Sequence, residues 1–91
     1  MKPVFAKGFV HQYQQLPQAI QRRFDKALRF LLLDPHYPSL RTKKMESQRD
    51  LFGRDIWEAR VNERYRFTFV IDADTYILYR IGPHDIERHP R

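Results

Sequence analysis

The hydrophobic periodicity of this chain changes near residue 56, and that change limits the possible folds more than any other feature. Over residues 17–33 apolar side chains recur every three or four positions, as on the buried side of a helix. The stripe comprises Ile20, Phe24, Ala27, Leu28, Leu31 and Leu32. From Ile56 onward apolar and polar residues alternate, which is the period of a half-buried strand. Helices followed by strands are typical of an α+β fold.

The remaining segments extend this prediction to a single domain over residues 1–91. Val4 and Phe5 predict a short N-terminal strand, and a first helix before the Leu16-Pro17 break makes a two-helix hairpin with the second. The alternating half predicts three strands, because residues 62–64 and 72–75 are short enough for hairpin connections. We expect an antiparallel three-stranded meander whose apolar face, with Trp57 and Tyr79, packs on the helices.

Composition and charge indicate a folded, basic protein. Hydrophobic residues make up 42% of the 91 residues and aromatic residues 14%, which argues against disorder, and the absence of Cys excludes disulfides and thiolate sites. We expect a soluble cytoplasmic protein, since no apolar run is long enough to span a membrane and no secretory signal is evident.

The positive charge is concentrated in the first half of the chain. Residues 1–45 carry nine basic and two acidic groups (+7), and residues 46–91 carry eight basic and nine acidic groups (−1). This basic half suits phosphates or an acidic protein, although charge of this kind also serves solubility alone.

The alternation also predicts a polar face on the sheet, opposite the helices. It gathers Glu58, Arg60, Arg66, Thr68 and Arg80, with Lys43 or Lys44 arriving from the basic run at residues 41–44 and His84 at the end of the last strand. These groups are either cross-strand charge pairs on a solvated face or a site for a bound anion. The spacing of His84, Asp85 and His89 matches no known metal-ligand pattern, so we predict no metal.

The residue types on this face fit RNA cleavage without a metal ion. Such cleavage needs a base for the 2′-hydroxyl proton, cations for the charge on the transition state and an acid for the leaving 5′ oxygen. An arginine fork can hold two phosphate oxygens, and a histidine can transfer protons near neutral pH. Glu58 is a candidate base, provided that the neighbouring arginines do not lower its pKa too far.

Three sequence segments resemble the RelE/ParE superfamily of bacterial toxins. They are residues 38–44 (PSLRTKK), residues 57–67 (WEARVNERYRF) and residues 81–85 (IGPHD), and the likeness spans nearly the whole chain. The resemblance implies a messenger-RNA endonuclease that needs no cofactor, acts on the ribosome and is restrained by a cognate antitoxin. It also implies no membrane association. We expect a monomer when the chain is free.

The same resemblance assigns roles to individual residues. Arg66 matches the phosphate-contacting arginine, Arg60 matches the basic position on the preceding strand, and His84 matches the acid/base histidine. RNA binding is expected of Arg41, Lys43, Lys44 and Arg80. Glu58 is nominated on its chemistry rather than on the resemblance.

One departure from the family pattern leaves other functions open. Many RelE-type toxins have an aromatic residue shortly after the last strand, whereas residues 85–91 of this chain contain none. The alternatives are a ParE-like inhibitor that binds DNA gyrase without cutting RNA, and a catalytically weak scaffold that binds its antitoxin.

Overall fold

The computed structural model describes all 91 residues and has the expected α+β architecture. Its elements are β1 (Lys2–Phe5), α1 (Lys7–Gln14), α2 (Gln18–Leu33), the 3-10 turn η1 (Pro38–Leu40), β2 (Lys43–Arg49), β3 (Asp55–Arg60), β4 (Tyr65–Asp72), β5 (Thr75–Pro83) and the 3-10 turn η2 (His84–Arg88). The predicted N-terminal strand and helical hairpin are therefore confirmed. Pro17 is the residue immediately before α2, with φ −53° and ψ 144°, and α2 ends two residues before Pro35.

The sheet has five strands in the order β1-β5-β4-β3-β2, so the predicted meander of three strands forms its centre. β1 pairs with β5 in parallel and β2 pairs with β3 antiparallel. The sequence prediction missed β2 because Met45 is its only buried residue, so it shows no apolar alternation. Charged side chains are common on edge strands, where they discourage pairing with other chains. Lys43 and Lys44 thus lie at the start of a strand that the sequence analysis did not predict.

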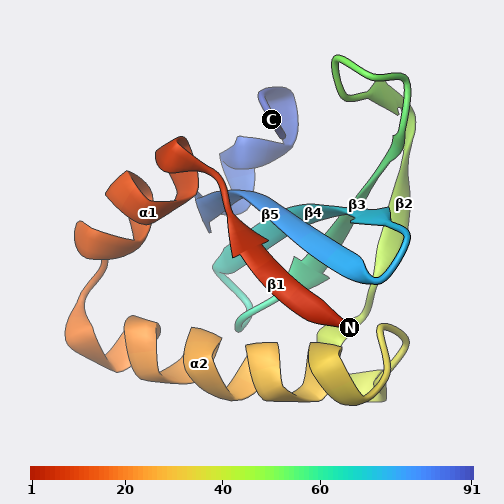
Figure 1. The fold of residues 1–91 in the computed structure, drawn as a ribbon. Coiled ribbons are helices and arrows are strands. Elements are labelled where there is room, and N and C mark those ends of the chain that lie inside the picture. The colour runs from red at the N-terminus through yellow and green to blue at the C-terminus, as the bar shows by residue number, and fades with distance from the viewer.

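Both helices pack on one face of the sheet and form the main core. Figure 1 shows α2 along one side of the sheet and the C-terminal turn on the other side. Phe24 of α2 lies between Phe9 of α1 and Phe67 of β4, with ring centroids 5.2 Å away in each case. Burial of large side chains such as these contributes roughly 1.5–3 kcal/mol each. Neither helix has the length and the apolar character needed to cross a bilayer.

A bulge in the β4–β5 pairing corrects the predicted orientation of β5. Thr68 pairs with Arg80 and Phe69 pairs with Leu78, so Tyr79 is an extra residue in β5. Leu78 therefore faces the helices, whereas Ile77 and Tyr79 pack on the opposite face against a small cluster of Met45, Ile56 and Val70. The prediction that Tyr79 faces the helices was wrong, because an inserted residue reverses the alternation along a strand. Trp57 packs against the helical core as expected.

Candidate functional site

The candidate site is built around Glu58, a buried carboxylate on the face of the sheet that is turned away from the helices. Trp57 and Ala59 contact the helical core, so the alternation along β3 directs Glu58 to the other face. Only 2% of Glu58 is exposed, and its Oε2 atom has no hydrogen-bond partner. Burial raises the pKa of Glu58, the negative charge of Glu87 raises this pKa further, and Lys43, Arg66 and His84 act in the opposite direction. A buried, incompletely paired carboxylate of this kind favours accepting a proton.

Two cations approach Glu58 from the neighbouring strands. Lys43 is paired with Glu58 across β2 and β3, and its Nζ lies 3.6 Å from Glu58 Oε1. Arg66 on β4 has its Nε 4.0 Å from the same oxygen. The Nη1 atom of Arg66 donates hydrogen bonds to the backbone carbonyls of Asn62, Glu63 and Tyr65, at 2.6, 3.0 and 3.2 Å. The β3–β4 turn therefore fixes the guanidinium next to the carboxylate.

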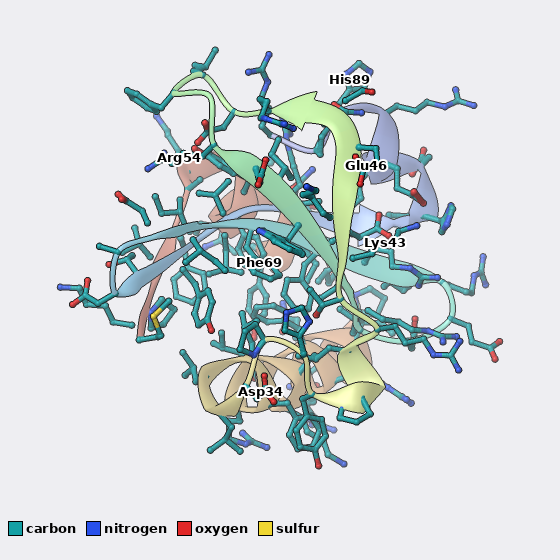
Figure 2. The ribbon with its side chains drawn as sticks, turned by 90° about the vertical axis from the view of Figure 1, so that its right-hand side faces the viewer. Asp34, Lys43, Glu46, Arg54, Phe69 and His89 are labelled. Carbon is teal, nitrogen blue, oxygen red and sulfur yellow. The ribbon has the colours of Figure 1, made fainter.

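The C-terminal turn η2 adds an imidazole and a second carboxylate. His84 Nε2 lies 2.6 Å from Glu87 Oε1, and Glu87 Oε2 lies 3.8 Å from Lys43 Nζ. Figure 2 shows Lys43 on the side of β2 where the C-terminal segment with His89 lies. Gly82 allows this packing, because a Cβ atom at position 82 would lie 2.9 Å from Cγ2 of Ile86. The chain thus brings His84 to the same cluster as Glu58, Lys43 and Arg66.

Glu87 is a member of this cluster that the sequence analysis did not nominate. Its i, i+3 spacing from His84 is the only available signal, and it becomes informative once residues 84–88 are known to form a helical turn.

The other predicted residues lie outside this contact network. Arg60 pairs with Arg66 across β3 and β4, but its Nε donates to the carbonyl of Asn62 at 3.3 Å and its Nη2 lies 4.0 Å from Glu63. Arg80 Nε donates to the carbonyl of Arg91 at 2.9 Å. Arg41 is exposed in a left-handed backbone conformation before β2, and Lys44 is exposed on β2. No group of three or more His, Asp or Glu side chains is arranged to hold a metal ion.

The arrangement combines three chemical functions, which are connected by contacts through Lys43 and Glu87. Glu58 can accept a proton, Lys43 and Arg66 carry positive charge beside it, and the exposed ring of His84 can exchange a proton with a bound molecule. This set of groups suits an anionic substrate whose negative charge increases as it reacts.

Comparison with known proteins gives matches in structure but not in sequence. No family model and no curated protein matches the chain. A chain of the RelB–RelE antitoxin–toxin complex from Methanococcus jannaschii is 20% identical, with a TM-score of 0.71 over 94% of this chain and 95% of that one. A chain of the RelE–RelB complex from Pyrococcus horikoshii OT3 is 24% identical, with a TM-score of 0.70 over 90% and 91%.

A chain from the structure of a YoeB dimer from Staphylococcus aureus is 15% identical, with a TM-score of 0.73 over 92% of this chain and 97% of that one. These alignments span both helices and the sheet rather than a shared fragment. The chain therefore has the fold of the RelE and YoeB toxins, which confirms the fold that its sequence resemblance implied.

Proposed function

We propose that this chain is the toxin of a toxin–antitoxin pair and acts as a metal-independent endoribonuclease on messenger RNA. The observation that carries the proposal is the buried carboxylate of Glu58 between the cations of Lys43 and Arg66, beside His84. Cross-strand charge pairs on a solvated face would be exposed and fully paired. Glu58 is neither, and the fold is one that toxins use.

Each residue of the cluster has a role in the proposed reaction. Glu58 accepts the proton of the 2′-hydroxyl, whose oxygen then attacks the adjacent phosphorus. Only 3% of the Glu58 side chain is exposed, so this step requires the side chain of Lys43, which is 60% exposed, to move aside as RNA binds. Burial brings the pKa of Glu58 nearer to neutral pH, where a general base is most effective. Arg66 and Lys43 stabilise the additional negative charge on the phosphate as the new bond forms.

His84 supplies the proton that the departing 5′ oxygen needs. Glu87 contacts Nε2 of the ring, which leaves Nδ1 as the nitrogen available to the substrate. The side chain of His84 is 64% exposed, so a bound RNA can reach it. In this assignment the turn η2 supplies the leaving-group chemistry without the C-terminal aromatic residue of many RelE-type toxins.

The RNA backbone is proposed to follow the exposed cations that precede the site. Arg41, Lys43 and Lys44 lie at the start of β2, and Arg60 and Arg80 flank the cluster on β3 and β5. Each phosphate that these groups neutralise releases counterions, so binding weakens as salt rises. The proposed substrate is messenger RNA on the ribosome in the cytoplasm.

The proposed protein partner is a cognate antitoxin. The structures from M. jannaschii and P. horikoshii are complexes of RelE with RelB. An acidic antitoxin would suit residues 1–45 of this chain, with their charge of +7 from nine basic and two acidic groups. The free toxin is proposed to be a monomer.

Primer extension on messenger RNA after induction tests the proposal. We expect cleavage and growth arrest with the native chain and the loss of both with Arg66→Ala or His84→Ala. Arg29→Ala is the control, because Arg29 is an exposed arginine on α2 that lies outside the candidate site. Growth arrest with intact messages and halted DNA replication would contradict the nuclease and favour a gyrase inhibitor. Induction without any effect on growth would contradict the toxin.

A further inference from the structure

A cavity lies between α2 and the β3–β4 turn, next to the candidate site. Its volume is about 840 Å³, within the range of ligand-binding pockets. α2 contributes Arg23, Lys26 and Phe30 to its walls, and the end of β3 with the following turn contributes Arg60 and Arg64. Of the residues to which a role is assigned above, only Arg60 lines this cavity.

The walls of the cavity combine positive charge with apolar surface. Arg60 pairs with Glu63 at 4.0 Å, and it is the one cation of the four that has a carboxylate partner. Phe30 stacks on Tyr37 with ring centroids 4.1 Å away and planes 2° apart, so its ring is held in place. Phosphates pair with Lys and Arg, while unpaired bases stack on aromatic rings or arginine planes. A nucleotide has both groups, whereas a simple anion has only one.

The cavity and the catalytic cluster share a wall. The carbonyl of Asn62 accepts hydrogen bonds from Arg60 Nε at 3.3 Å and from Arg66 Nη1 at 2.6 Å. Arg60 lines the cavity, and Arg66 lies beside Glu58. A strand of RNA whose phosphate is held at Arg66 can therefore bring a neighbouring nucleotide to the side of the turn where the cavity lies.

We propose that this cavity binds an unpaired nucleotide of the RNA substrate next to the cleaved bond, and so contributes to the choice of cleavage site. The inference rests on the proposed nuclease function and deepens it. An acidic peptide could also be attracted by the cations, but it would leave the wall formed by Phe30, Ala27 and Leu40 without a partner. The shared Asn62 carbonyl gives a reason for RNA in particular, because it links the cavity to the phosphate-binding arginine.

The test compares two double variants that remove the same charge from α2. Arg23→Ala with Lys26→Ala removes two cations of the cavity, and Arg22→Ala with Arg29→Ala removes two exposed cations of α2 that do not line it. Binding is measured by fluorescence anisotropy with a short single-stranded RNA whose 2′-hydroxyls are methylated, so that it cannot be cleaved. Cleavage is measured with the unmodified RNA.

We expect the cavity variant to bind the methylated RNA about tenfold more weakly. The slope of the logarithm of the binding constant against the logarithm of salt concentration should become shallower by about 1.4, or about 0.7 for each lost phosphate contact. Its KM should rise far more than its kcat falls, and primer extension should show an altered set of cleavage sites. The control variant should stay within about twofold of the native chain in KM, since remote charges act weakly at physiological salt.

Two outcomes would overturn the inference while leaving the nuclease intact. The first is equal effects of both double variants on KM, with an unchanged cleavage pattern. The second is unchanged RNA binding by the cavity variant together with weaker binding of a polyglutamate peptide, which would assign the cavity to an acidic protein segment. Failure of the native chain to cleave any RNA would instead reject the proposed function.

Discussion

Two buried carboxylates lie on the same face of the sheet, and their surroundings differ. Asp50 is 5% exposed and Glu58 is 2% exposed. Asp50 accepts hydrogen bonds from the backbone N–H groups of Phe52 and Arg54, from Nε of Arg54 and from the hydroxyl of Tyr79, at 2.7–3.1 Å. Glu58 has two ion pairs at 3.6 and 4.0 Å, and one of its oxygens has no hydrogen-bond partner.

The pKa shifts of Asp50 and Glu58 distinguish a carboxylate that stabilises the fold from one that can accept a proton. The pKa of Asp50 is lowered, because hydrogen bonds to Arg54, Phe52 and Tyr79 outweigh the opposing effect of burial. The pKa of Glu58 is raised, because burial outweighs its cations. Asp50 closes the β2–β3 turn, in which Gly53 adopts a φ of 77°. In Figure 2, Arg54 and Lys43 lie to either side of β2, so the two centres are separate.

The largest effect is expected from Glu58→Gln. This change keeps the shape of the side chain but removes the proton acceptor, so we expect RNA cleavage to fall by about 10²- to 10⁴-fold. The unfolding temperature should stay the same or rise, because the substitution removes a buried, incompletely paired charge. Single-turnover cleavage and thermal unfolding measure the two effects. Glu46→Gln, an exposed glutamate on β2, is the control and should change neither.

A Glu58→Gln variant that cleaves RNA at the native rate would remove Glu58 from the mechanism. If that variant also unfolded at a lower temperature, the carboxylate would have the structural role that we assign to Asp50.

Asp50→Asn should have the opposite effects, lowering stability while leaving RNA cleavage by the folded protein unchanged. An amide cannot accept all the hydrogen bonds that the two carboxylate oxygens accept, and Arg54 loses its partner at 2.7 Å. We expect a loss of about 2–4 kcal/mol in the free energy of unfolding, since Arg54 keeps a second partner in Asp72 at 3.1 Å. Urea denaturation measures this loss. The folded fraction should cleave RNA normally, and a cleavage defect beyond the loss of folded protein would contradict the separation of the two centres.

The sequence predicts the parts of the fold that depend on local pattern. The stripe on α2, the break at Pro17 and the alternation around Phe67 each follow from neighbours in the chain, and the structure confirms them. β2 was missed because an edge strand with one buried side chain carries no apolar pattern. The β4–β5 bulge was missed because it depends on pairing between strands, which the sequence of β5 alone does not encode.

The candidate site also has features that the sequence alone does not predict, because they depend on contacts between strands. Alternation placed Glu58 and Arg66 on one face, but only the tertiary structure separates Arg66, which approaches Glu58, from Arg60, which turns toward Glu63. The raised pKa of Glu58 likewise depends on burial in the folded chain and on the charge of Glu87, which is distant in sequence.

The smallest effect concerns the pH dependence of stability, for which the two carboxylates should act with opposite sign. Stability rises with pH wherever the unfolded chain binds more protons than the folded one. Because the pKa of Asp50 is lowered in the folded chain, its carboxylate stabilises the fold at pH values above the pKa of an unfolded aspartate. This stabilisation is lost as pH falls through the folded-state pKa. Because the pKa of Glu58 is raised in the folded chain, its protonated carboxyl stabilises the fold at pH values below the pKa of an unfolded glutamate. This stabilisation is lost as pH rises through the folded-state pKa.

Thermal unfolding of the native chain and the two variants between acidic and neutral pH separates these contributions. Relative to the native chain, Glu58→Gln should gain stability as pH rises toward neutral, because it lacks the group whose ionisation is unfavourable in the fold. Asp50→Asn should instead come closest to the native chain at low pH, where the native carboxylate is protonated. Parallel curves for all three proteins would mean that neither carboxyl has a folded-state pKa that differs from its unfolded value. Their different partners would then not distinguish a base from a turn-closing residue.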